Sequence, residues 1–109
     1  MSKMRSAYPQ CKAVYVDVDG TLCESVAEWA RGKKAEGYTA VLWSSAGADH
    51  ARAEADRIGC ADVWDHILTK PGIIVDDRGT TWAGYASVIH PRQIIGAALK
   101  RSRMTQEGR

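Results

Sequence analysis

The sequence has no apolar run long enough to cross a membrane, and its first ten residues hold no apolar core of the kind found in secretion signals. It has only three cysteines, at positions 11, 23 and 60, and they show no spacing typical of a metal site. An odd cysteine count without a secretion signal favours reduced thiols, so we expect a cytoplasmic protein. Repeats, low-complexity tracts and linkers are also missing. We therefore expect a single domain over residues 1–109, with flexible ends at 1–12 and 102–109.

The chain also lacks a strong excess of charge of either sign. It has 15 Lys and Arg residues against 13 Asp and Glu, and the net charge of +2 is too small to indicate a nucleic-acid or membrane partner by itself. The charge is unevenly distributed: residues 1–12 carry +3, residues 100–109 carry +3, and the middle carries −4. An acidic body between basic ends fits a site that uses a cation, although basic ends can also serve solubility alone.

The remaining sequence alternates between segments typical of strands and segments typical of helices. Strands are expected at 13–18, 39–43, 63–68, 73–75 and 85–89, and helices at 24–36, 49–58 and 91–99. Segments 39–43 and 73–75 are continuously apolar, as is typical of parallel strands that are buried on both faces. The pattern predicts an α/β fold: a three-layer, Rossmann-like sandwich with a mainly parallel central sheet.

Three of the expected strands end in polar residues. These are Asp17 and Asp19 at the first, Ser44 and Ser45 at the second, and Asp76 and Asp77 after segment 73–75. Ligands of open parallel sheets bind beyond the carboxyl ends of the strands, so we expect these side chains to meet at one edge. Four carboxylates in one crevice need a positive partner. Oxygen ligands without histidine or cysteine suit Mg²⁺.

A phosphoryl group bound beside such a cation would also need hydrogen-bond donors. Ser44 offers a hydroxyl, and the turn after it offers backbone N–H groups near the start of a helix. Lys70, just before segment 73–75, could supply a positive charge. A carboxylate can attack phosphorus to form an aspartyl phosphate, and a second carboxyl nearby can protonate the leaving oxygen.

Four short segments, in order, resemble the motifs of the haloacid dehalogenase superfamily in its phosphatase branch. They are DVDGT (17–21), VLWSS (41–45), TKPG (69–72) and IIVDD (73–77), and the region they span covers most of the chain. The resemblance implies that Asp17 is the nucleophile and Asp19 the general acid/base. It further implies that Asp17 and Asp19 help to hold the metal, the latter through its backbone carbonyl, and that Gly20 lies against the substrate.

The other motifs carry further implied roles. Ser44 would donate a hydrogen bond to the phosphoryl group, with Ser45 as the alternative. Lys70 would stabilise the nucleophile and the charge of the phosphoenzyme. Asp77 would bind Mg²⁺, and Asp76 would be a second ligand or would support one.

The resemblance implies a Mg²⁺-dependent phosphatase without a cap domain. The two stretches where the family often inserts a cap, after residue 21 and between residues 45 and 70, are short here. The site would therefore be open to a bulky phosphorylated substrate, such as a nucleotide or a nucleic-acid end, or be covered by a neighbouring subunit in an oligomer. Asp19 favours phosphoryl transfer over carbon–halogen chemistry. Two alternatives stay open: a narrower one, a nucleotide or polynucleotide-end phosphatase, and one of a different class, a non-catalytic module that binds Mg²⁺ and phosphate.

Simpler interpretations exist for most of these residues. Ser44 could cap a helix, and Lys70 could be an exposed lysine before a turn. Asp76 could serve only to form a turn. The three histidines, at positions 50, 66 and 90, have no mutual spacing that suggests a metal site, so surface or capping roles are expected for them.

Overall fold

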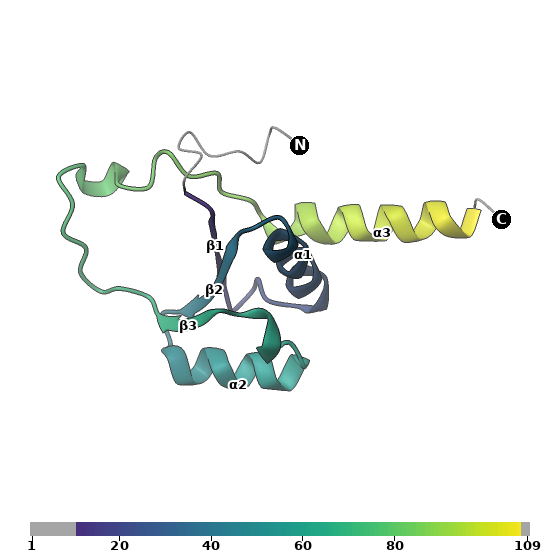
Figure 1. The fold of residues 1–109 in the computed structure, drawn as a ribbon, viewed down its shortest axis with the longest axis horizontal. Helices are drawn as coiled ribbons and strands as arrows, with labels where there is room; N and C mark the ends of the chain where they lie inside the picture. Colours follow the sequence, from purple (N-terminus) through teal and green to yellow (C-terminus); the bar gives the residue numbers. More distant parts are fainter. Residues whose placement is uncertain (1–10, 108–109) are drawn as a thin grey trace.

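The computed structural model describes residues 11–107, and side chains up to residue 100. In chain order its elements are β1 (Ala13–Asp17), α1 (Glu24–Ala35), β2 (Thr39–Ser44), α2 (Ala48–Ile58), the 3₁₀ turn η2 (Ala61–Val63), β3 (His66–Thr69), the 3₁₀ turn η3 (Gly79–Thr81) and α3 (Pro91–Glu107) (Figure 1). Among residues 11–107, no helix is both long and apolar enough to span a bilayer.

The three strands form one parallel sheet in the order β1-β2-β3. Each strand is joined to the next through a helix. Parallel neighbours need such a crossover, because a tight hairpin would make the second strand run in the opposite direction. The parallel α/β class expected from the sequence is therefore confirmed.

One face of this sheet is covered by α1 and α2. The hydrophobic core lies between that face and the two helices. Every second residue of a strand points to the same face, so Val16 and Leu42 reach this core together. The helices contribute mostly small apolar side chains to it, and the buried set is Val26, Ala27, Ala30, Ala51 and Ala55. Alanine side chains are small, so they let the helices approach the sheet closely.

The opposite face of the sheet carries larger side chains and is more open. Tyr15 and Trp43 meet there edge to face, with ring centroids 4.7 Å apart. Tyr15 is 51% exposed and Leu68 is 42% exposed. Within the described residues no helix covers this face, because α3 packs against α1, and its Ile94 reaches only the margin of the core. The structure thus contains two of the three layers that we expected.

A glycine follows each of the two helices that flank β2. Gly37 follows α1 with φ at +98°, and Gly59 follows α2 in the left-handed conformation with φ at +85°. A residue with a Cβ rarely adopts such angles, so glycine lets the chain leave the helix at once. At Gly59 the turn is closed by the N–H groups of Gly59 and Cys60, which both donate to the carbonyl of Ala55 at 2.9 Å.

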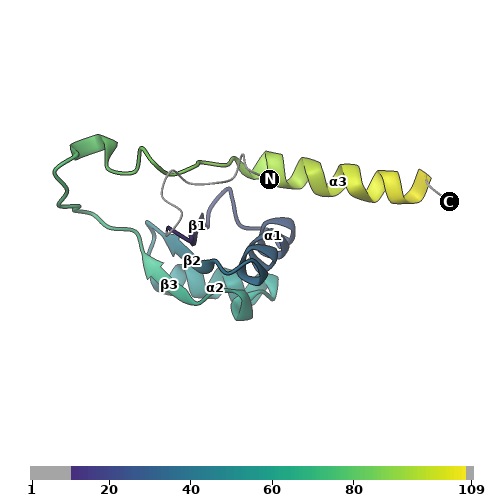
Figure 2. The same ribbon diagram turned by 45° about the horizontal axis from the view of Figure 1, so that its top comes forward.

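The chain after β3 differs from the expectation. Segments 73–75 and 85–89 are not strands: they belong to a long loop, residues 70–90, that contains η3 and swings away from the sheet before α3 begins (Figures 1 and 2). Ile73 is 86% exposed and Val75 is 96% exposed. The apolar run predicted a strand, but a strand also needs a neighbour that accepts its backbone hydrogen bonds, and none of the described strands pairs with 73–75.

Element boundaries show smaller differences. The expected strand at 63–68 is divided into η2 and β3, which begins at His66. The last helix continues to Glu107, past the expected end at residue 99. Residues 102–107, expected in a flexible end, are helical, while residues 1–10 and 108–109 lie outside the described part. The radius of gyration is 15.3 Å, above the about 13 Å typical of a compact domain of this length, because the loop and α3 extend from the body.

Candidate functional site

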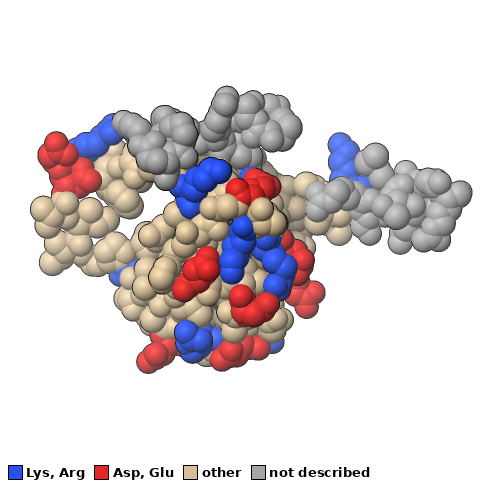
Figure 3. Space-filling view, in the orientation of Figure 1, with Lys and Arg blue, Asp and Glu red and all other residues tan. Residues whose placement is uncertain are grey.

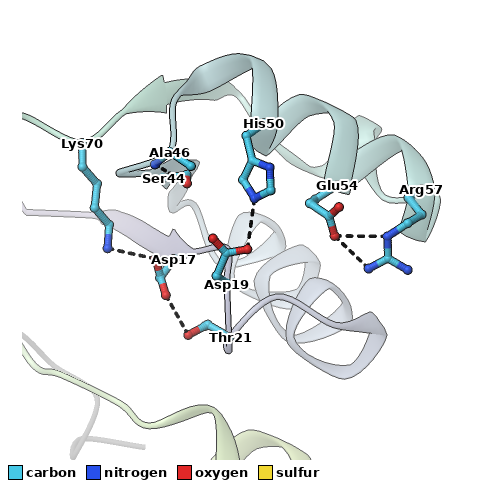
Figure 4. A network of polar contacts seen from close by, with 9 residues as sticks. All are labelled: Asp17, Asp19, Thr21, Ser44, Ala46, His50, Glu54, Arg57 and Lys70. Atoms are coloured by element: carbon cyan, nitrogen blue, oxygen red, sulfur yellow. Dashed lines mark hydrogen bonds and ion pairs between the residues drawn. The ribbon is translucent and has the colours of Figure 1, made fainter.

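The register of the sheet places three predicted site residues side by side. Asp17 pairs with Trp43, the residue before Ser44, and Ser44 pairs with Thr69, the residue before Lys70. All three strands run in the same direction, so Asp17, Ser44 and Lys70 come together at the carboxyl end of the sheet (Figure 4). This is the edge at which we expected the site.

Asp17 is held by two side chains, one on each carboxylate oxygen. Lys70 Nζ lies 2.9 Å from Oδ1, and the Thr21 hydroxyl donates to Oδ2 at 3.2 Å (Figure 4). Partial burial raises the pKa of Asp17, but the hydrogen bond and charge of Lys70, with help from Thr21 and the backbone at Val18, outweigh it and lower the pKa below its ordinary value. The carboxylate is therefore ionised at neutral pH and fixed in orientation.

A turn after β1 brings Thr21 back to Asp17. Gly20 has φ at +80°, which allows the N–H groups of Thr21 and Leu22 to donate to the carbonyl of Val18, at 3.1 and 2.9 Å. A residue with a Cβ would be strained at this position. The predicted role of Gly20 beside a substrate stays a prediction. In the structure Gly20 shapes the turn that positions Thr21.

Ser44 is the last residue of β2 and opens a second turn, in which the N–H of Gly47 donates to its carbonyl at 3.1 Å; it is almost completely buried, with 2% of its surface exposed. Its hydroxyl oxygen accepts a hydrogen bond from the N–H of Ala46 at 3.0 Å, and its carbonyl oxygen accepts from the N–H of Lys70 at 2.9 Å. Ser44 therefore connects the end of β2 to Lys70. Ser45, which we expected as the alternative donor to a phosphoryl group, is exposed beside it.

Helix α2 starts directly after this turn. Its N-cap is Gly47, with φ at +112°, so Ser44 is not the helix cap that the simpler interpretation suggested. The N–H of Ala48 donates to the Thr69 hydroxyl at 2.9 Å. This contact ties the helix to the end of β3, and so fixes the first turn of α2 relative to Lys70.

The second carboxylate, Asp19, has a partner that sequence reasoning missed. Its Oδ1 lies 3.0 Å from Nε2 of His50, in the first turns of α2 (Figure 4). The hydrogen bond with Asp19 raises the pKa of His50, and desolvation opposes this shift. The two carboxylates thus avoid mutual repulsion, since each has its own basic partner. No local spacing could identify the contact, because 31 residues separate the two side chains.

Asp76 and Asp77 are not brought to this edge. They lie in the exposed loop after β3, where the carboxylate of Asp76 accepts a hydrogen bond from the N–H of Arg78 at 2.8 Å. Figure 3 shows acidic and basic side chains together at the outer end of this loop. The expected placement depended on a strand at 73–75 in the sheet. Since that strand is not formed, its carboxyl end does not reach Asp17.

The residues present do not assemble the expected four-carboxylate Mg²⁺ site. Both oxygens of Asp17 have protein donors, and Asp19 faces His50. Across the part of the chain that the structure describes, no group of three or more His, Cys, Asp or Glu side chains is arranged to hold a metal ion. The arrangement therefore does not by itself fit the predicted metal, and we assign no ligand geometry to it.

Comparisons of the chain with protein-family models, with curated proteins and with solved structures found no match. The site is therefore interpreted from its own geometry and from the motifs in the sequence.

Proposed function

We propose that this protein is a phosphatase that hydrolyses a phosphomonoester through an aspartyl phosphate on Asp17, as the resemblance to the haloacid dehalogenase superfamily implies. The main support is the contact between Asp17 and Lys70 at 2.9 Å, which joins residues 53 positions apart in the sequence at the carboxyl end of a parallel sheet. A nucleophilic carboxylate must be ionised and correctly oriented, and the lowered pKa and two donors of Asp17 meet both requirements.

In the first step, an oxygen of Asp17 attacks phosphorus and forms a new P–O bond. The bond between phosphorus and the leaving oxygen breaks, and the carboxyl group of Asp19 gives its proton to that oxygen, which leaves as an alcohol. Lys70 lies beside the attacking group, where its ammonium can offset the negative charge of the phosphoryl oxygens.

In the second step, water attacks the same phosphorus atom. The carboxylate of Asp19 takes a proton from that water, and the P–O bond to Asp17 breaks. Inorganic phosphate leaves, Asp17 is again a carboxylate, and Asp19 again carries a proton. Asp19 suits both proton transfers because its side chain is 72% exposed and therefore open to substrate and water.

A requirement for Mg²⁺ is part of this proposal on the strength of the sequence motifs alone. A divalent cation would supply charge neutralisation for a phosphate beside Asp17. The steps above use only the chain's own residues, because Asp76 and Asp77 lie in the loop.

The open site favours bulky substrates over small ones that need enclosure. Neither cap stretch forms a separate layer over the sheet edge: residues after Gly20 lead directly into α1, and residues 45–70 contain only α2, η2 and β3. A nucleotide or the phosphorylated end of a nucleic acid would fit such an edge. We propose these as the substrates to test first.

The experiment is a phosphatase assay with p-nitrophenyl phosphate, mononucleotides, a 3′-phosphorylated oligonucleotide and sugar phosphates, with Mg²⁺ and with EDTA. We expect turnover by the wild type in Mg²⁺, loss of activity in EDTA, and a loss of roughly a thousandfold or more in Asp17→Asn. Asp56→Asn, an exposed carboxylate on α2, is the matched control and should keep full activity.

The outcomes separate the alternatives. A wild type inactive on the whole panel, or an Asp17→Asn variant with full activity, contradicts the proposed function. Tight phosphate binding without turnover would instead favour a non-catalytic module. Preference for the oligonucleotide or for mononucleotides would support the narrower substrate class, and equal, poor rates on all substrates would leave that class unsupported.

A further inference from the structure

We propose that His50 is a positioning residue for Asp19, and that its ring N–H fixes which oxygen of that carboxyl group faces the leaving group. This inference rests on the proposed phosphatase function and extends it to a residue that none of the sequence motifs includes. The observation behind it is the 3.0 Å contact between Nε2 of His50 and Oδ1 of Asp19.

Asp19 needs such a restraint more than Asp17 does. Asp17 is held by a lysine and a threonine, whereas Asp19 is contacted by the side chain of His50. Asp19 lies two residues beyond the end of β1, and its side chain is 72% exposed. A free carboxyl group in that position would rotate, and either oxygen could carry the proton. Effective acid catalysis requires the proton to point at the reacting oxygen.

The contact between His50 and Asp19 can restrain the carboxyl group, because of which atoms donate and which accept hydrogen bonds. When Nε2 carries a hydrogen, it donates to Oδ1, and that oxygen can accept whether or not the carboxyl group is protonated. The proton of Asp19 therefore belongs on Oδ2, the oxygen turned away from the ring. The same arrangement serves the second step, in which Oδ2 takes a proton from water.

His50 is well placed to hold this position because it lies on a fixed helix. Ala51 and Ala55 of α2 are fully buried against the sheet, and Thr69 binds the N–H of Ala48. Glu54, one turn after His50, is held in turn by Arg57 through contacts of 3.1 and 2.8 Å (Figure 4). The face of α2 that meets Asp19 therefore carries polar side chains that are held in place by one another.

The test compares substrates that differ in their need for an acid. p-Nitrophenyl phosphate releases a stable phenolate and needs little proton transfer, whereas an alkyl phosphate such as glycerol 2-phosphate needs a full proton. For His50→Ala we expect kcat with the alkyl phosphate to fall about 10- to 100-fold, and kcat with p-nitrophenyl phosphate to change by less than about threefold. KM should stay similar for both. His50→Gln, which keeps an N–H donor on a side chain of similar length, should recover part of the loss.

The control variant is His66→Ala, which removes an exposed histidine at the far end of β3. It should match the wild type with both substrates, and thermal melting should confirm that all variants are folded. An equal loss of kcat on both substrates, or no loss on either, would overturn the role of His50 while leaving the phosphatase proposal intact. A wild type inactive with both substrates in Mg²⁺ would instead contradict the proposed function, and the inference would fall with it.

Discussion

Residues 11–70 and residues 71–107 both contain apolar runs, but the two parts have very different structures. The first part forms a parallel sheet with two helices, and it contains the buried core. The second part consists of an exposed loop and one helix, and its apolar residues Ile73, Val75 and Val88 are each more than 80% exposed. The difference shows that an apolar run becomes a strand only where a neighbouring strand edge accepts it.

The largest expected difference between the two parts is in proteolysis. Trypsin should cut after Arg78, in the exposed loop, at least roughly a thousandfold faster than after Arg57, which is also exposed but lies within α2. Cleavage within a packed helix requires the helix to open first, whereas Arg78 lies in an exposed turn of the loop. Mass spectrometry of the first fragments would measure this ratio, and a first cut within α1 or α2 would contradict the comparison.

Core packing gives the next largest effect. Leu42→Ala removes a fully buried side chain from the middle of β2 and should lower the free energy of unfolding by about 2–5 kcal/mol. Leu99→Ala, on α3, removes the same atoms from a position that is 59% exposed, and should cost less than about 0.5 kcal/mol. Urea unfolding monitored by circular dichroism would compare them. Equal costs would mean that α3 belongs to the same core.

The part of the fold that could be predicted from sequence is the part in which local and long-range signals agree. β1, β2, α1 and α2 were predicted to within a residue or two, because strand-forming runs alternate with helices that end at Gly37 and Gly59. The predicted strand at 73–75 was wrong: its apolar pattern is typical of a strand, but no strand among residues 11–107 pairs with it. Pairing is a property of the whole chain, and no local pattern contains it.

The candidate site likewise has residues whose positions could be predicted from the sequence and residues whose positions could not. The approach of Asp17, Ser44 and Lys70 follows from parallel strands ending at one edge, so it was predictable, and the structure brings the three together. The placement of Asp76 and Asp77 depended on the strand that is not formed. His50 was missed because its contact with Asp19 depends on how α2 rotates about its own axis, which the sequence does not indicate.

The smallest expected effect is on the pH dependence of stability. It also arises within residues 11–70. The N–H of Ala40 donates to Asp65 at 2.8 Å, and this bond, helped by Lys34 and opposed by desolvation, lowers the pKa of Asp65 below 3.8. The unfolded state then binds a proton first, so this contribution is present above about pH 4 and is lost as the pH falls through the lowered pKa. Urea unfolding at several acidic pH values should give a shallower acid dependence for Asp65→Asn than for the wild type. An unchanged dependence would contradict the assignment.

His50 also contributes to folding stability, but its contribution changes with pH in the opposite direction. Its pKa is raised above 6.5 by Asp19, so its contribution to stability is complete below about pH 6.5 and is lost as the pH rises through the raised pKa. An NMR titration of the His50 ring should give a pKa above 6.5 that falls in Asp19→Asn. A pKa that does not change in that variant would show that the two side chains do not interact in solution.

The most direct test of the central claim is to trap the covalent intermediate. The wild type, turning over p-nitrophenyl phosphate with Mg²⁺, would be quenched in acid and reduced with borohydride, which converts an aspartyl phosphate to homoserine. Mass spectrometry of the peptide that contains the DVDGT segment would then locate the change. The account predicts homoserine at Asp17 and an intact Asp19. Homoserine at Asp19, or turnover without any modified aspartate, would contradict it.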